Sequence, residues 1–535
     1  MREESSAARG ALALSIAGIL SKVISVAYTP LLIAILGDEG YGLYAKVLEV
    51  FLFIYAIATV GAQPAVAKVV AEFNAHGDKD GALRTLNVSR KFYFVVGSLA
   101  GIFMMLIAFP IANIVKSPKI AYGIIALGPC ILITALLSAY RGYMQGNNNM
   151  KSIAISQIFE QFLNVIISLL CAFILMSFGL AQGVAGAQVG TSVGALFALI
   201  YLIYCFIKND YEGQAFECDV NEDITNKDIR KKIILYSIPI IMSAGLQNLG
   251  GLIDMGNVTT RLASIGFEED YINIIYGFYS KYKTLIGVPM VIITAIGVSI
   301  LPVISKHREL RDKKEVRNNI RYGLRSSMSI AIPAAVGLAM VADPIYMVLY
   351  GNTRGAAFLK IGSFILVLMA LTQIQTTILQ GINKFYYILF TFSIGLLFKI
   401  GLNFIFVGIK SINIYGVLIG NCFWYLIPAV LNHRKICKSI KMRIHMITIL
   451  FKPLLSSLVM ALGIFIVNKP VQLLYGVIEP SRLVCIPVVI LEVCVGVFIY
   501  ASLMVYLGGI KRKDIESISP KLIRIMPRFM RMKLK

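Results

Sequence analysis

The sequence contains few of the residues that metal sites and disulfide frameworks need. Among its 535 residues there are four histidines, eight cysteines and a single tryptophan. The histidines all sit in hydrophilic connections and form no HExxH motif, while the cysteines form no CxxC pair. Most of the cysteines lie in apolar stretches, where they usually pack as small hydrophobes. We therefore predict no metal site and no bound cofactor.

Long hydrophilic segments are also missing, so no part of the chain can build a separate soluble domain. Hydrophobic residues make up 58% of the sequence and the mean hydropathy is +0.77, whereas a soluble domain is only about half apolar. Apolar stretches of about 20 residues, the length that crosses a bilayer, recur from end to end. The fold class is therefore all-α and polytopic. We interpret the first apolar stretch as a spanning helix rather than a cleaved signal peptide.

Hydropathy predicts fourteen transmembrane helices, with boundaries defined to about four residues. Prolines inside them are expected to bend the helices without ending them, as membrane helices tolerate. The expected spans are 10–36, 41–66, 92–115, 120–145, 152–178, 184–207, 233–260, 276–303, 326–349, 357–381, 386–408, 412–432, 450–468 and 484–507.

Acidic residues are scarce, with 28 Asp and Glu against 51 Lys and Arg. If the N-terminus is inside, the inside segments carry 36 of these cations and the outside loops only 7, which follows the positive-inside rule. This predicts a multi-pass protein of the cell membrane with both termini cytoplasmic. The basic runs at 306–308, 313–314 and 511–513 are interpreted as topology anchors beside anionic lipid, so that the net charge of +23 needs no nucleic-acid partner.

An internal repeat divides the chain. Tyr-Gly-Leu-Tyr-Ala-Lys at 41–46 matches Tyr-Gly-Phe-Tyr-Ser-Lys at 276–281, and Gln-Gly-Asn-Asn-Asn at 145–149 matches Gln-Gly-Ile-Asn-Lys at 380–384, each 235 positions later. Because each copy holds six helices, an even number, the two copies start on the same side and are parallel repeats, as in transporters that rock two lobes. The predicted regions are an N-lobe at 1–208, a cytoplasmic linker at 209–232, a C-lobe at 233–432, and two further helices with a basic tail at 433–535.

Several motifs resemble those of a known family. GILSK at 18–22, GDEGYGLY at 37–44, RGYMQGNNNMK at 141–151 and ISQIFEQ at 155–161 are similar to the stage V sporulation protein B-like, polysaccharide biosynthesis branch of the multidrug/oligosaccharidyl-lipid/polysaccharide exporter superfamily. This superfamily includes the lipid II flippase. The resemblance implies a two-lobed flippase for undecaprenyl-pyrophosphate-linked saccharides, working in cell-envelope or spore-cortex biosynthesis. In that family a basic residue commonly precedes the first-helix proline, whereas here Thr29 precedes Pro30.

Charged residues within the predicted spans are the candidates for substrate binding, because a charge in the hydrocarbon is costly and usually faces a cavity. The candidates are Lys22, Lys46, Glu49, Asp254 and Lys281. Lys46 and Lys281 occupy equivalent repeat positions, yet their amines could instead reach the headgroups from near the span ends. Glu49 lies three residues after Lys46, on the same helical face, and could simply neutralise it. Asp254 could bind a coupling ion or pair with a basic side chain.

Four functions compete on this evidence. Basic intramembrane residues favour an anionic headgroup, so a lipid-linked saccharide and membrane lipids are the expected partners. A cation-coupled multidrug exporter of the same fold is the alternative, although it would need an acidic cavity. A membrane glycosyltransferase is disfavoured because no outside loop carries a carboxylate cluster, so we expect no enzyme activity. A non-transporting scaffold is the fourth. No P-loop is present, and the sequence does not indicate the coupling ion or the oligomeric state.

Overall fold

The computed structural model describes residues 2–209, 211, 225–475, 479, 481–509 and 531. Within these residues all regular structure is helical and no strand occurs, which confirms the all-α prediction. Most of the predicted linker and of the basic tail lies outside the described residues. The described part divides into two compact units, 1–280 with 392–420 and 281–391 with 421–535.

Helices long and apolar enough to span a membrane number twelve in the described part, or thirteen if a bent pair is one span. One of them, 20–75, has 56 residues and would be about 84 Å long as a single straight helix, far more than a bilayer core of about 30 Å. It covers most of the expected span 10–36 and all of the span 41–66, which are separated at Gly37, whose positive φ of 71° breaks the helix. All fourteen expected spans fall on helices, although the count of fourteen remains a prediction.

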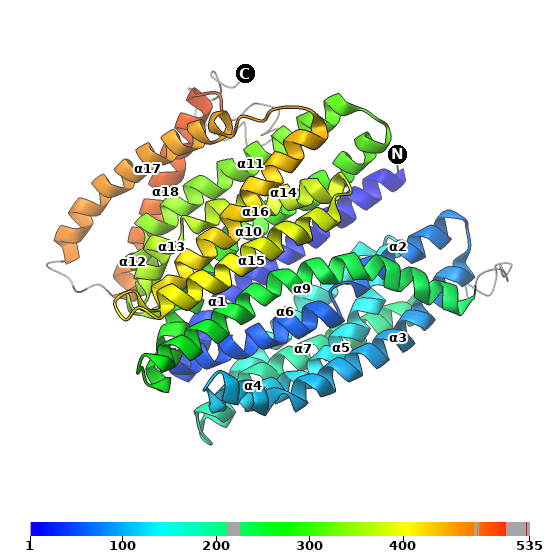
Figure 1. The fold of residues 1–535 in the computed structure, drawn as a ribbon, viewed down its shortest axis with the longest axis horizontal. Coiled ribbons are helices and arrows are strands. Elements are labelled where there is room, and N and C mark those ends of the chain that lie inside the picture. Colours follow the sequence, from blue (N-terminus) through cyan, green and yellow to red (C-terminus); the bar gives the residue numbers. More distant parts are fainter. Residues whose placement is uncertain are drawn as a thin grey trace. The chain divides into compact units, whose positions relative to one another are not determined.

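The first unit is a bundle built largely from the first half of the chain. Its helices α5, α6 and α7 pack side by side, with α3 against α5 and α1 against α6 and α9 (Figure 1). The bounds are α1 Arg2–Ala58, α2 Ala62–Ala75, α3 Lys79–Leu106, α4 Ala108–Ile114, η1 Pro118–Ile120, α5 Ala121–Gly146, α6 Met150–Met176, α7 Leu180–Lys208, α9 Asn226–Ser264 and η2 Asn413–Tyr415. The start of α10 (Glu269–Glu309), the end of α15 (Phe385–Val407) and the start of α16 (Gly416–Ile440) complete it.

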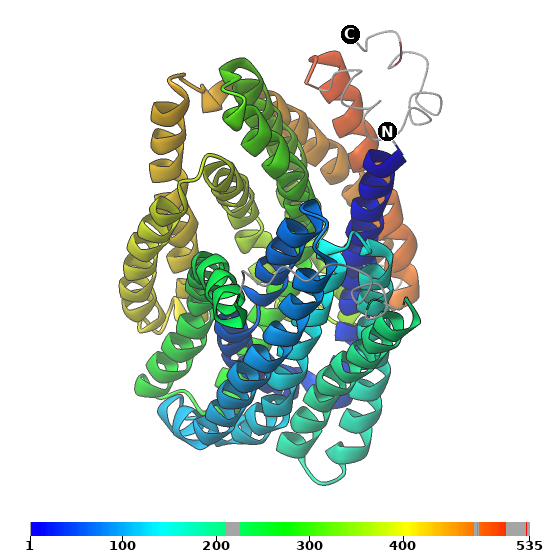
Figure 2. The same ribbon diagram turned by 90° about the vertical axis from the view of Figure 1, so that its right-hand side faces the viewer.

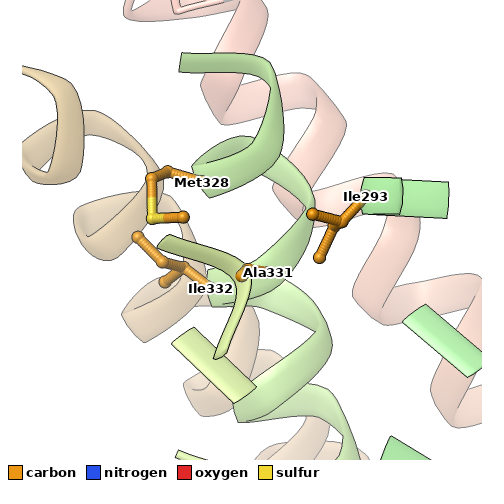
Figure 3. Packing of buried hydrophobic residues seen from close by; sticks show 5 residues of the cluster. Ile293, Met328, Ala331 and Ile332 are labelled. Carbon is orange, nitrogen blue, oxygen red and sulfur yellow. The ribbon is translucent and has the colours of Figure 1, made fainter. Parts of the chain in front are cut away.

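The second unit contains the rest of α10, α15 and α16 together with six further helices. Around α11, Ile293, Met328, Ala331, Ile332 and Ala370 form an apolar core (Figure 3). Helix α17 packs against α11 and α18, and these two last helices run beside each other at the orange and red end of the chain (Figure 2). The bounds are α11 Lys313–Met340, α12 Ala342–Tyr350, α13 Ala356–Gly362, α14 Ile365–Gly381, α17 Met446–Tyr475 and α18 Arg482–Tyr506.

Polar residues at the helix starts explain where several helices begin. Asp78, Asn149 and Ser481 accept hydrogen bonds from backbone N–H groups in the first turns of α3, α6 and α18. Thr225 and Asp228 form a reciprocal capping box at α9, and Asp312 accepts from two N–H groups of α11. Each cap satisfies donors that a helix leaves unpaired.

The repeat is visible in the turns of the two units. Asn148 in the first unit and Asn383 in the second both adopt left-handed φ values, 58° and 52°. Each following residue donates its backbone N–H to the carbonyl five positions earlier, Asn149 to Met144 and Lys384 to Leu379. The two turns, 235 positions apart, thus share one geometry, because asparagine tolerates this conformation.

The compact units do not follow the predicted lobes. Helix α9 and the first turns of α10, expected in the C-lobe, belong to the first unit. Ser237 of α9 shows why, since its hydroxyl donates to the carbonyl of Gly61 and meets the hydroxyl of Tyr93 at 3.0 Å. The division into functional lobes therefore stays a prediction.

Candidate functional site

Helices α1 and α10 cross at a pair of glycines that the repeat makes equivalent. A Cβ atom on Gly42 would lie 1.9 Å from the carbonyl oxygen of Asn273, and one on Gly277 would lie 2.5 Å from the carbonyl oxygen of Asp38. Only glycine permits this approach. The crossing brings the motif of the first repeat against its counterpart in the second, within the first unit.

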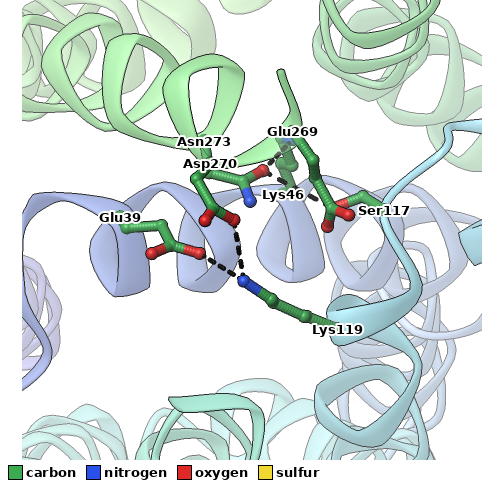
Figure 4. A network of polar contacts seen from close by, with 7 residues as sticks. All are labelled: Glu39, Lys46, Ser117, Lys119, Glu269, Asp270 and Asn273. Atoms are coloured by element: carbon green, nitrogen blue, oxygen red, sulfur yellow. Dashed lines mark hydrogen bonds and ion pairs between the residues drawn. The ribbon is translucent and has the colours of Figure 1, made fainter.

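Lys46 lies beside this crossing and is completely buried. Its ammonium donates to Asn273 Oδ1 at 2.5 Å (Figure 4). It also lies 5.7 Å from the ring centroid of Tyr276. Ser117, on the turn before α5, donates to Asn273 and Glu269. Lys46 forms no ion pair within the described chain. The amine is therefore covered by protein, and the alternative that it reaches the headgroups is not what the structure shows.

Lys119 connects the same region to a more exposed layer of charge. Its ammonium lies 2.8 Å from Glu39 Oε1 and 2.8 Å from Asp270 Oδ1 (Figure 4). Glu39 belongs to the first repeat and Asp270 to the second, so this lysine ties the two repeat motifs together. Its side chain is 36% exposed, so water screens both ion pairs.

Asp254 of α9 is at the centre of a second, fully buried cluster. Its carboxylate accepts from Lys399 Nζ at 2.9 Å, Tyr279 Oη at 2.9 Å and Asn403 Nδ2 at 2.8 Å. Both charged side chains are at most 3% exposed. Of the two alternatives for Asp254, pairing with a basic side chain is the one that the structure contains.

Lys22 differs from these lysines. It is half-buried in α1 and has no hydrogen bond or ion pair to any described residue. Thr29, seven residues later, is buried and donates its hydroxyl to the carbonyl of Ser25 at 3.1 Å. The Thr29 hydroxyl is thus already used as a donor within the helix, whereas the Lys22 ammonium has no partner among the described residues.

The remaining candidates are Glu49 and Lys281. Glu49 is half-buried, with its carboxylate over the bare backbone of Gly251, where a Cβ atom would lie 1.9 Å from it. It is not the neutralising partner of Lys46, whose contact is Asn273. Lys281, in the second unit, is completely buried with its amine 4.8 Å from the ring centroid of Tyr350. Whether these five residues bind substrate is still a prediction.

Sequence reasoning missed the neutral partners of the buried lysine and aspartate. Asn273 and Asn403 carry no charge and therefore give no signal in a search for intramembrane ions. For Asn273 the repeat offers such a signal, because this residue stands 235 positions after Asp38 of the loop motif at 37–44. Nothing in the pattern singles out Asn403.

Two segments of the chain, 7–308 and 271–354, match families described as polysaccharide biosynthesis protein. The first match alone covers more than half of the sequence. The chain belongs to this polysaccharide biosynthesis family. The family confirms the resemblance drawn from the motifs around Lys22, Gly42 and Arg141.

Curated relatives extend the similarity over most of the chain. Stage V sporulation protein B of Bacillus subtilis (strain 168) is 26% identical over 76% of this chain and 79% of its own length. Lipid II flippase MurJ of the same organism is 24% identical over 78% of this chain and 80% of its own length. The matches run through both repeats rather than through one motif.

Solved structures show the same fold at low identity. The inward closed conformation of lipid II flippase MurJ superposes with a TM-score of 0.66 at 14% identity, covering 92% of this chain and 97% of that one. An inward-facing multidrug resistance transporter of the MATE family gives 0.62 at 16% identity, covering 79% and 94%. The fold is therefore that of the exporter superfamily.

Proposed function

We propose that this protein is a membrane flippase that moves a saccharide linked to undecaprenyl pyrophosphate, a lipid II-like molecule or a polysaccharide precursor. The observation that carries the proposal is Lys22, a cation within a spanning segment that has no partner in the described chain. An unpaired charge at this depth is unfavourable unless a ligand or water meets it, and a diphosphate would supply the opposite charge. The names of the relatives, a lipid II flippase among them, agree with this substrate class.

Transport would proceed by alternating access, with lobes 1–208 and 233–432 rocking about the linker 209–232. The layer formed by Glu39, Lys119 and Asp270 is suited to hold one end of the repeats together, because a single lysine serves both. Exposed ion pairs of this kind are weak and can break and re-form. The driving force would be an ion gradient, the membrane potential or mass action.

The proposed orientation places both termini in the cytoplasm, with the glycine crossing near the outer face. The charge bias of the loops supports it. In this arrangement the sugar headgroup passes through the protein while the polyprenyl tail stays in lipid, near α17 and α18. No bond is made or broken, so we propose a transporter without enzyme activity.

A cation-coupled multidrug exporter is the second candidate, supported by the structural similarity to MATE transporters. Such an exporter would use an acidic cavity. Asp254 is the more buried of the two acidic candidates, and its carboxylate already accepts hydrogen bonds from Lys399, Tyr279 and Asn403. This observation places the multidrug function second.

The test is flipping in proteoliposomes with headgroup-labelled lipid II, compared with other polyprenyl-linked sugars and with a cationic dye. A flippase moves at least one polyprenyl diphosphate and leaves the dye. Dye movement driven by a sodium or proton gradient, with no lipid movement, would assign the second function instead. Empty liposomes provide the background rate.

A further inference from the structure

We propose that one end of the second unit contains a binding site for the phosphate headgroup of an anionic membrane lipid. The site is a cavity of about 690 Å³ at the ends of α10, α11, α14 and α16, a size typical of ligand pockets. None of the candidate residues described above lines it, and it does not depend on what the protein transports.

Charge is the first argument. Eight lysine and arginine side chains line the cavity against one carboxylate, Asp312. That carboxylate already caps α11 through the backbone N–H groups of Lys314 and Glu315. Six of the cations have no side-chain hydrogen bond or ion pair within the described chain, namely Arg308, Arg311, Lys313, Lys384, Lys438 and Lys441. So many unpaired cations around one space repel each other unless an anion occupies it.

The backbone gives a second, independent argument. Arg311 and Lys441 turn the chain with φ values of 58° and 50°, a left-handed conformation that side chains other than Gly and Asn rarely adopt. The third turn at this cavity has Asn383 at the equivalent conformation, the residue normally found there. Two of the three turns therefore carry a cation where an uncharged residue would be easier to accommodate, which indicates that the charge is used.

The walls of the cavity are fixed by contacts between helices. Arg317 of α11 donates to the carbonyls of Ile440 at 3.0 Å and Lys441 at 3.2 Å, which joins α11 to the end of α16. Lys435 lies over the ring of Tyr387 at 4.8 Å. The cations are thus held around one space rather than spread over a flat face.

The lining also indicates a lipid rather than a soluble anion. Val316, Ile382 and Ile440 form an apolar part of the wall, which suits the glycerol and upper acyl chain of a phospholipid. The cavity lies where spanning helices end, at the depth of the headgroups if the proposed orientation holds. Clustered cations at such a position attract anionic lipid, and each contributes to the binding.

The test uses the full-length protein, delipidated in detergent and titrated with fluorescent phosphatidylglycerol. The variant is Arg311→Asn/Lys441→Asn, which removes two cavity charges while placing a residue that favours each turn, so the fold has no reason to fail. The matched control is Lys306→Gln/Lys314→Gln, which removes two exposed charges from the same end that do not line the cavity. Phosphatidylcholine and inorganic pyrophosphate complete the set.

We expect the cavity variant to bind phosphatidylglycerol about tenfold or more weakly, given the contribution of each cation near a membrane surface. The control should keep the affinity of the unmodified protein, and phosphatidylcholine should bind weakly to all three. Equal losses of affinity in the variant and the control would show that the lipid binds to a diffuse basic face and not to this cavity. Pyrophosphate binding as tight as that of the lipid would show a site for a soluble anion, and unchanged affinity in the cavity variant would also overturn the proposal.

Discussion

Lys399 and Lys46 are both buried lysines of the first unit, yet the protein satisfies them in different ways. Lys399 meets a carboxylate, Asp254, at 2.9 Å, and Tyr279 and Asn403 complete the carboxylate's hydrogen bonds. Lys46 meets an amide oxygen and the face of an aromatic ring. The first charge has a direct ion pair inside the fold, whereas the second contacts an amide oxygen and a ring and forms no direct ion pair within the described residues. A lysine that its own fold leaves without a direct ion pair is the better candidate for meeting a substrate anion.

The largest expected effect is on the neutralised pair. Asp254→Ala would remove the carboxylate that neutralises the buried Lys399, a change that typically costs about 3–5 kcal/mol. We expect a marked loss of thermal stability in detergent, measured by the temperature at which the monodisperse peak disappears. The double variant Asp254→Asn/Lys399→Gln should recover most of the loss, because the amides keep partners for Tyr279 and Asn403 without any charge. Equal instability of single and double variants would contradict an ion pair as the cause.

Lys22, the cation without a described partner, should show the opposite pattern, with a loss of activity and no loss of stability. Lys22→Gln should abolish complementation of a flippase-depleted strain while leaving expression and thermal stability unchanged, because Lys22 has no described partner to lose. Two unit charges about 4 Å apart attract by roughly 4 kcal/mol at an effective dielectric near 20, which is large enough to decide substrate binding. Lys22→Arg should keep much of the activity. Full activity of Lys22→Gln at normal expression, checked by blot, would mean that this lysine does not hold the headgroup.

Substitutions at Lys46 and Lys281 should have effects of intermediate size and so sharpen the comparison between the buried lysines. Each is fully buried, and the repeat makes them equivalent, so Lys46→Met and Lys281→Met should each reduce complementation moderately. The double variant should lose more than the two single losses together. Lys46→Met should keep the thermal stability of the unmodified protein, unlike Asp254→Ala, since it strands no opposite charge. A loss of stability as large as that of Asp254→Ala would show that Lys46 is structural.

The sequence predicts more of the fold than of the site, for a physical reason. Hydropathy and loop charge act over whole segments, so the spans agree with helices such as α5 and α6 almost residue by residue. The offset of 235 positions also anticipates the shared turn geometry at Asn148 and Asn383. Contacts between distant helices leave no such signal. Asn403 lies 149 positions from Asp254, and an uncharged residue in an apolar stretch looks like any other.

For the same reason, the sequence alone predicts neither the cavity of the second unit nor the division into compact units. The basic residues near 306–314 and 434–441 are evident in the sequence, but only the fold shows that Arg317 brings α11 and the end of α16 together around one space. The units depart from the repeat because helix α9 packs on the first half of the chain through residues such as Ser237. The boundaries of a sequence repeat show which segments are copies of each other, whereas the compact units depend on which helices are in contact.

The smallest expected effect concerns the exposed lysine of the same region. Lys119→Gln removes two ion pairs, to Glu39 and Asp270, but the lysine is 36% and Asp270 is 64% exposed. Pairs of this kind contribute about 0.2–1 kcal/mol each, and salt screens them. We expect a small drop in thermal stability at low salt that vanishes near 1 M salt. Glu39→Gln should lower the thermal stability at low salt slightly more than Asp270→Asn, because Glu39 is only 23% exposed.

Asp254→Ala, measured in parallel, should stay destabilised at every salt concentration, since a buried pair is hardly screened. The comparison would fail if Lys119→Gln lowered the thermal stability as much as Asp254→Ala and did so independently of salt. Water would then not reach the ion pairs of Lys119, and solvent exposure would not distinguish Lys119 from the buried Lys399.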